Sequence, residues 1–265
     1  MTEDRRIDEA ARQLFEDQRS NRNLADLPKR LRPRSLAEGY AIQDRLLDHL
    51  LAQGDGPIAG WKIALTTRVM QQLFGVDHPC EGAILASRVY IEKVTVRGAD
   101  FASLAVEPEI AVRLAHDLSP DGAPYDRKSA GDAVGEAMTA IEIVDTRNVD
   151  SRTVDGPLLI ADNVVNRGCV LGQPVTKWRD LDLAALGMRM LINGEVVGQG
   201  VGSDVLGHPL EALAWLANGL IRRGRQLHAG DIVLTGSIVP LYWLQPGDAM
   251  ASLADGLGEA HVSVR

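Results

Sequence analysis

Short apolar segments dominate the chain from Ile58 onward, and Gly, Pro and Asp separate them. Runs of four to eight apolar or alternating residues between such breakers are typical of β-strands. Few helical patterns lie between these runs, which favours an α+β fold over a doubly wound α/β fold. The strand-like segments are WKIALT, GAILASRVY, VEPEIAVRL, MTAIEIVD, CVLG, MRMLINGEVVGQG, DIVLTG and AHVSVR.

Residues 1–57 have a different, helical texture. Apolar residues recur at helical spacing near the start, and a second pattern runs from Ser35, which has Glu38 at capping-box distance, to a stop at Gly54. We therefore expect an N-terminal helical region (1–57) and a strand-rich region (58–265) that together form effectively one domain. Within 58–265 we expect a helix in HPLEALAWLANGL, a hairpin turn at Asn193-Gly194 and an exposed, mobile loop at 119–132.

Composition excludes several classes of partner. The chain has 265 residues with 28 basic and 36 acidic side chains, a net charge of -8, which disfavours nucleic acid. The first residues, MTEDRRIDEA, lack the apolar core of a secretory signal, and no apolar run approaches membrane-spanning length. Cys80 and Cys169 form neither a disulfide framework nor a zinc pattern. We expect a cytoplasmic protein.

Three glutamates lie in segments that otherwise read as buried strand. Glu107 and Glu109 in VEPEI point to the same face of a strand, and Glu142 lies in the apolar run MTAIEIVD. Lys62 has the same setting in GWKIALT. Buried carboxylates require a positive partner, so the alternatives are buried Lys–Glu ion pairs, a solvated strand face, or a cation site. Oxygen-only ligands would select a hard ion, Mg²⁺ or Mn²⁺.

An ordered series of motifs resembles a known family. GWKIALTT, GVDHPCEG, VEPEIAV, AIEIVDTR, ADNVVNRGCVLG, VLGHPLEALAWLAN, GDIVLTGS and QPGD occur in the order found in 2-keto-4-pentenoate hydratases and the related 4-oxalocrotonate decarboxylases. Both groups belong to the fumarylacetoacetate hydrolase superfamily. The resemblance runs from about Ser35 to the C-terminus, and it implies a mixed β-roll catalytic core preceded by N-terminal helices.

The resemblance also implies roles for individual residues. It makes Mg²⁺ or Mn²⁺ the positive partner of the glutamates, and it places a lysine, an aspartate, an asparagine and a serine near the substrate. The matching residues are Glu107, Glu109 and Glu142 as metal ligands, Lys62 and Asp77 as catalytic residues, and Asn163 and Ser237 as substrate contacts. His208 precedes a helix, where capping is the ordinary role.

The implied activity is hydration of a 2-hydroxydienoate or 2-oxoenoate in the catabolism of aromatic ring-cleavage products. The alternatives are decarboxylation of 2-oxo-3-hexenedioate (4-oxalocrotonate), C–C hydrolysis of an acylpyruvate, and a non-catalytic role as a partner subunit. The family further implies a homo-oligomer, alone or in complex with another pathway enzyme.

Three departures from the family pattern stand out. Pro108 occupies the middle of E-x-E, where it removes a ladder donor and predicts an edge or a bulge. Val164 and Val165 replace small or hydroxyl residues, and IVPLYWLQ, with Tyr242 and Trp243, replaces a less aromatic segment. These changes predict a more apolar pocket.

Overall fold

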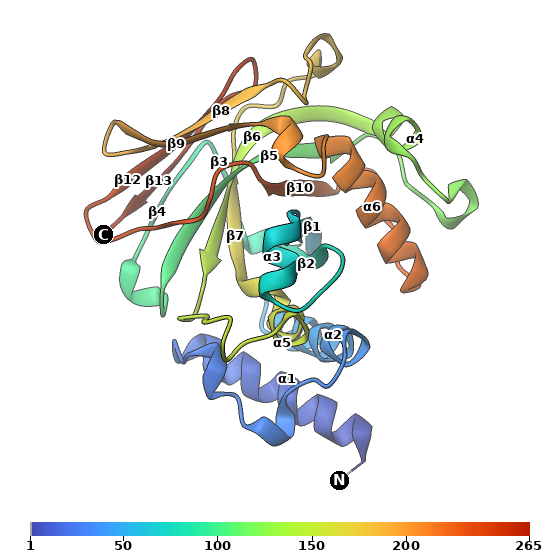
Figure 1. The fold of residues 1–265 in the computed structure, drawn as a ribbon, viewed down its shortest axis with the longest axis vertical. Helices are drawn as coiled ribbons and strands as arrows, with labels where there is room; N and C mark the ends of the chain where they lie inside the picture. The colour runs from blue at the N-terminus through green and yellow to red at the C-terminus, as the bar shows by residue number, and fades with distance from the viewer. Residues whose placement is uncertain (1) are drawn as a thin grey trace.

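Two β-sheets form the body of the protein, and the computed structural model describes residues 2–265 (Figure 1). One sheet has the strand order β2-β1-β10-β5-β6-β7-β3, with β11 pairing to β5 beyond the end of β10. Its strands are β1 (Ile58–Ala64), β2 (Cys80–Leu85), β3 (Val89–Ile91), β5 (Leu104–Leu114), β6 (Val134–Asp145), β7 (Asn166–Leu171), β10 (Ile232–Ser237) and β11 (Tyr242–Trp243).

The second sheet has the order β4-β13-β12-β8-β9. Its strands are β4 (Lys93–Val96), β8 (Gly187–Ile192), β9 (Glu195–Val201), β12 (Ala249–Ala254) and β13 (Gly258–Val264). The predicted turn joins β8 to β9, and both Asn193 (φ 53°) and Gly194 (φ 88°) adopt the left-handed backbone of a type I′ turn. The predicted α+β architecture is confirmed.

The N-terminal helices are α1 (Glu3–Arg19) and α2 (Leu36–Ala52), which lie together at one end of the molecule (Figure 1). Ser35 caps α2 by accepting a hydrogen bond from the backbone N–H of Glu38, and Gly54 has φ 89° just beyond the helix. Helix α6 (Pro209–Arg222) is the one expected between strands. No helix in residues 2–265 is both long enough and apolar enough to cross a membrane.

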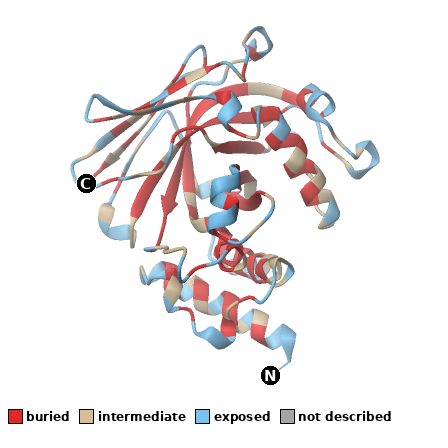
Figure 2. Cartoon of the chain, viewed as in Figure 1, coloured by how far each residue is buried: buried red, intermediate tan, exposed pale blue. Residues whose placement is uncertain are grey.

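One hydrophobic core joins the helices to both sheets. Buried side chains run from Leu14 in α1 and Leu46 in α2 through Ile110 in β5 to Val262 in β13. The central strands are buried along most of their length (Figure 2). Strands β5 and β6 therefore offer a dry, rigid platform for any polar side chain that they carry.

Three short helices were missed from the sequence: α3 (Arg68–Leu73), α4 (Arg127–Asp132) and α5 (Gly156–Ala161). Helix α4 lies in the predicted loop 119–132, so that prediction was wrong for its second half. Asp126 and Ser129 form a reciprocal capping box there, and Ala130 and Gly131 are buried. Six-residue helices are too short to display a clear helical periodicity.

Pro108 lies in a central strand, so the predicted edge position was wrong, but the predicted irregularity is present. Strand β10 pairs with β5 as far as Ser237–Glu109, with a register shift on the way, and β11 resumes the pairing at Tyr242–Val106. Pro108 falls between these two partners and accepts a hydrogen bond from the backbone N–H of Ile238 at 3.1 Å. The backbone nitrogen of Pro108, which has no hydrogen to donate, therefore faces the side of β5 on which the pairing is interrupted between β10 and β11.

Candidate functional site

The register of β5 and β6 brings the three glutamates together. Glu107 pairs directly with Glu142 across the two antiparallel strands, and Glu109 follows two residues along β5 on the same face. One carboxylate oxygen from each side chain lies within 4.8 Å of the other two. Such a spacing suits three ligands of one cation.

Three further elements, β1, β7 and β10, fix two of these carboxylates. Lys62 on β1 places Nζ 3.1 Å from Glu142 Oε2, and Asn166 at the start of β7 donates from Nδ2 to Glu142 Oε1 at 2.8 Å. The backbone N–H of Gly236, at the end of β10, donates to Glu109 Oε2 at 2.6 Å. The second oxygen of Glu109, Oε1, is buried and has no hydrogen-bond partner within residues 2–265.

The charges of the cluster do not balance. Burial, and then the negative charge of Glu142, raises the pKa of Glu107 to about 7. Burial and the charges of Glu142 and Glu107 raise the pKa of Glu109 well above its ordinary value. Burial alone would lower the pKa of Lys62, but the charges of Glu142, Glu107 and Glu109 outweigh burial and raise it. Lys62 is therefore the stable cation of the cluster.

The arrangement fits a divalent cation. Three ionised carboxylates and one protonated lysine leave two negative charges in a buried site. The unpartnered Oε1 of Glu109 and the all-oxygen ligand set both suit a hard ion of charge two. Glu107, Glu109 and Glu142 are the residues that would hold it.

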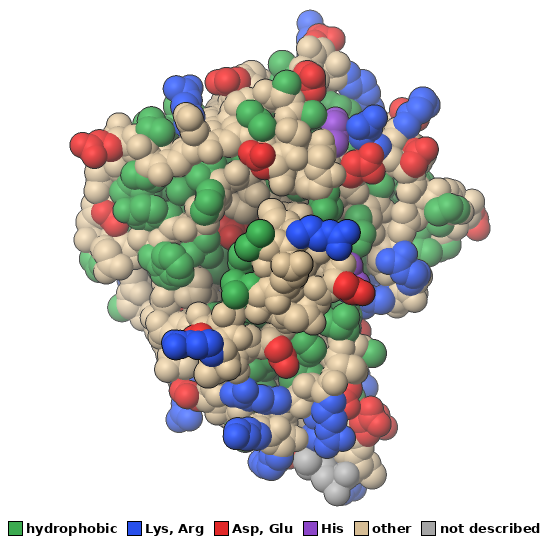
Figure 3. Space-filling view, in the orientation of Figure 1, with side chains coloured by type: hydrophobic (Ala, Val, Ile, Leu, Met, Phe, Trp, Pro, Cys, Tyr) green, Lys and Arg blue, Asp and Glu red, His purple; other side chains and the backbone are tan. Residues whose placement is uncertain are grey.

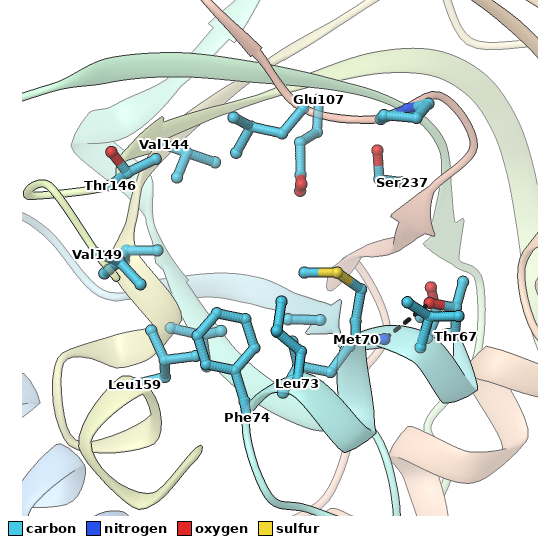
Figure 4. A pocket seen from close by; sticks show the side chains of 18 of the residues that line it. Thr67, Met70, Leu73, Phe74, Glu107, Val144, Thr146, Val149, Leu159 and Ser237 are labelled. Carbon is cyan, nitrogen blue, oxygen red and sulfur yellow. Dashed lines mark hydrogen bonds between the residues drawn. The ribbon is translucent and has the colours of Figure 1, made fainter. Parts of the chain in front are cut away.

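A cavity of about 940 Å³ lies against the cluster and reaches the surface. Lys62, Glu107 and Ser237 contribute to its wall, and Glu107 points into it (Figure 4). Helix α3, which sequence analysis missed, forms the facing wall through Met70 and Leu73. The face of the molecule drawn in Figure 3 carries hydrophobic side chains over its centre and left half, and most of its Lys and Arg side chains lie toward the lower and right margins.

Asp77 is the predicted catalytic residue that the structure does not bring to the cluster. Its side chain is 91% exposed, its Oδ1 lies 3.8 Å from Nε2 of His78, and it is not among the residues of the cavity wall. Ser237 does lie in the wall, with its hydroxyl donating to the backbone carbonyl of Val239 at 2.5 Å. His208 caps α6 by accepting from the backbone N–H of Leu210 at 3.0 Å, as predicted.

Asn163 holds a turn rather than facing the cavity. Its side chain accepts from the backbone N–H of Ala83 at 2.7 Å and donates to the Ala83 carbonyl at 2.8 Å, so both polar groups are occupied by β2. Asn163, Val164 and Val165 all have positive φ, at 55°, 48° and 56°. Such a conformation is rare for β-branched residues and stores backbone strain. The turn directs the carbonyl of Val164 to Lys62 Nζ at 3.5 Å and places both valines in the cavity wall.

Trp243 lines the cavity and is 55% exposed, with its indole N–H 3.5 Å from Thr146 Oγ1. Tyr242 pairs with β5 and lies outside the cavity wall.

Two groups that bind the glutamates, the side chain of Asn166 and the backbone N–H of Gly236, were not predicted from the sequence. Asn166 had a weak signal, because it is the second asparagine in DNVVN and lies at the start of the strand whose segment CVLG was predicted. The Gly236 amide has no side-chain signal at all.

The metal-free protein should lose stability as pH rises. Native Glu107 keeps its proton up to about pH 7, whereas the unfolded chain releases it near the ordinary value of 4.5. The native state therefore binds more protons in this window, and the free energy of unfolding falls between these two pH values. Denaturant unfolding in EDTA at pH 5 and pH 8 measures the fall. Glu107→Gln should show a smaller fall; an equal fall in both proteins would contradict the assignment.

Comparison with known proteins identifies the family. The profile of the fumarylacetoacetate (FAA) hydrolase C-terminal family matches residues 85–265, and the chain belongs to this family. Within it, the chain is 35% identical to the 2-keto-4-pentenoate hydratase of Paraburkholderia phymatum over 268 residues, 99% of each chain. It is 34% identical to the 2-hydroxyhexa-2,4-dienoate hydratase of Comamonas testosteroni, again over 99% of this chain and 98% of the relative. The predicted family resemblance is confirmed.

A solved structure shares the whole fold. The 4-oxalocrotonate decarboxylase from Pseudomonas putida G7, determined in complex with magnesium and adipate, superposes with a TM-score of 0.89 at 26% sequence identity. The match covers 100% of this chain and 99% of the decarboxylase. It confirms the predicted β-roll core with N-terminal helices, and it includes the helices that precede the family profile.

Proposed function

We propose that this chain is a divalent-metal-dependent hydratase that adds water to a 2-hydroxydienoate, or to its 2-oxoenoate tautomer, in the breakdown of aromatic ring-cleavage products. The observation that carries the proposal is the cluster of Glu107, Glu109 and Glu142 with Lys62 at the wall of an apolar cavity. The hydratase names of full-length relatives support it.

In this proposal Glu107, Glu109 and Glu142 hold Mg²⁺ or Mn²⁺. An ion held there would supply Lewis-acid polarisation of the bound 2-oxo acid. Lys62 stays protonated and offsets the negative charge that develops on the substrate while water adds at C4. Ser237 offers a hydroxyl at the same wall.

In this proposal Asn163 positions the turn that contains Val164 and Val165. Its side chain is hydrogen-bonded to the backbone of Ala83 and does not bind the substrate. We leave Asp77 out of the proposed catalytic set, because its side chain faces solvent. The apolar wall lowers the local dielectric constant around the substrate, which strengthens the electrostatic contribution of Lys62.

Decarboxylation of 2-oxo-3-hexenedioate is the second candidate. The whole-chain similarity to the 4-oxalocrotonate decarboxylase favours it. The two reactions use the same polarised 2-oxo acid and differ in the group beyond C4, so the metal cluster alone does not separate them.

A spectrophotometric assay tests the proposal. Purified protein is given 2-hydroxypenta-2,4-dienoate or 2-oxo-3-hexenedioate with Mg²⁺, Mn²⁺ or EDTA, while released CO₂ is measured. We expect metal-dependent loss of the dienoate absorbance without CO₂, and no loss in EDTA. Release of CO₂ from the diacid would move the assignment to decarboxylase. Absence of turnover of any dienoate by metal-loaded protein would overturn the hydratase proposal.

A further inference from the structure

The cavity is much larger than a five-carbon substrate requires. At about 940 Å³ it lies near the upper end of the range of about 300–1,000 Å³ that accommodates drug-sized ligands. In the proposed function, which this inference assumes, the carboxylate and 2-oxygen of the substrate lie at Glu107 and Lys62. Most of the cavity is then left for whatever the substrate carries at the far end of its diene.

The remaining wall is mostly apolar on one side, where Thr146 is the labelled side chain that carries a hydroxyl (Figure 4). Val144 from β6, Val149 from the following loop, Leu159 from α5 and Phe74 after α3 gather on the same side of Glu107 (Figure 4). The hydroxyls of Ser237 and Thr67 lie on the opposite side. A substrate whose acid end is held at Glu107 can therefore extend an apolar group between Val144 and Phe74.

The cavity has no counter-charge for a second carboxylate. Of the charged residues in its wall, within the described chain 2–265, Lys62 is the one cation, and it is paired with Glu142. The other charged residues in the wall are Glu107, Asp150 and Asp204. A substrate that ends in a carboxylate would bring a further negative charge against apolar side chains and acids.

We infer that the substrate carries a bulky, uncharged apolar group on C5, such as a ring or a branched chain, in place of hydrogen, methyl or carboxylate. Phe74, Val149 and Leu159 bind that group, and Leu73 covers it from α3. Each buried methylene contributes about a fourfold gain in binding. A butyl or phenyl group should therefore raise kcat/KM by about 30-fold or more over a methyl group.

A substrate series with the metal-loaded enzyme tests the inference. The probes are 2-hydroxypenta-2,4-dienoate and its C5-methyl, C5-butyl, C5-phenyl and C5-carboxylate derivatives, each with Mg²⁺ or Mn²⁺. We expect kcat/KM to rise from hydrogen through methyl to butyl and phenyl, with the carboxylate poorest. Highest kcat/KM for the unsubstituted, methyl or carboxylate compound would overturn the inference and leave the hydratase proposal standing. No turnover of any member would overturn the hydratase proposal itself.

A variant pair on α3 locates the apolar subsite. Leu73 is 50% exposed and lines the cavity, whereas its exposed neighbour Gln72 does not. Leu73→Arg should lower the ratio of kcat/KM for the phenyl compound over the carboxylate compound by at least about tenfold. Gln72→Arg is the matched control and should leave that ratio unchanged. Equal ratios in both variants, with circular dichroism showing both folded, would remove α3 from the subsite and contradict the inference.

Discussion

Glu109→Gln should reduce kcat/KM by at least about a thousandfold while leaving the fold intact. The amide has the shape of the carboxylate and still accepts the hydrogen bond from the Gly236 N–H, but it removes one anionic ligand from the cluster. A Lewis acid contributes several kcal/mol to such a reaction, and about 4 kcal/mol corresponds to a thousandfold in rate. Steady-state kinetics with Mg²⁺ or Mn²⁺ measures the loss.

The Tm of metal-free Glu109→Gln should not fall, whereas ordinary damage to the core would lower it. Glu109 is buried beside Glu107 and Glu142, and this repulsion raises its pKa. Removing its charge should leave the Tm of the metal-free protein equal or higher. The rise in Tm on addition of Mg²⁺ should be much smaller than in the unmodified protein.

Glu136→Gln is the matched control for this prediction. Glu136 lies on the same strand, β6, that carries Glu142, but it pairs with Arg113 at 2.8 Å and lies outside the cavity wall. It should keep full activity and the full response to Mg²⁺. If Glu109→Gln retained activity within tenfold of the unmodified protein, the three-glutamate site would not be the catalytic centre.

The glutamate cluster could be predicted from the sequence because its signals are local. A strand places i and i+2 on one face, so Glu107 and Glu109 had to lie together, and Glu142 stood out in an apolar run. The direct pairing of Glu107 with Glu142 required the register of β5 against β6, which no local pattern supplies. The family resemblance supplied the connection that the residues alone left open.

The apolar character of the pocket was predicted, but its shape could not be, because its walls depend on features that local propensities disfavour. Two consecutive valines at positive φ follow Asn163, and a sequence-based analysis assigns valine to extended backbone. Helix α3 has apolar residues that face an open cavity, so Val69 and Leu73 are exposed and do not form a core stripe. Away from the cavity, strand β12 was also missed, because three of the six residues in AMASLA are alanine, which weakens the contrast between its buried faces and its more exposed faces.

Lys62→Met should separate charge balance from catalysis. Lys62 is 2% exposed and is paired with Glu142, which is fully buried. Methionine preserves an unbranched side chain but leaves the three glutamates without their lysine. Removal of one partner of a buried pair costs about 3–5 kcal/mol, and we expect the free energy of unfolding of the metal-free protein to fall by that amount at pH 8. Denaturant unfolding in EDTA measures the change, which should shrink toward pH 5 as the glutamates take up protons.

Metal should restore the stability of Lys62→Met but not its activity. A divalent cation can neutralise the glutamates without the lysine, so the unfolding free energy in Mg²⁺ should approach that of the unmodified protein. The developing negative charge on the substrate would still lack its buried cation, and loss of one such preorganised group costs about 100- to 1,000-fold in kcat. Arg113→Met, which removes a cation that is 34% exposed from β5, is the control and should change neither quantity appreciably. If metal restored activity together with stability, Lys62 would only balance the charge of the glutamates, and its catalytic assignment would be wrong.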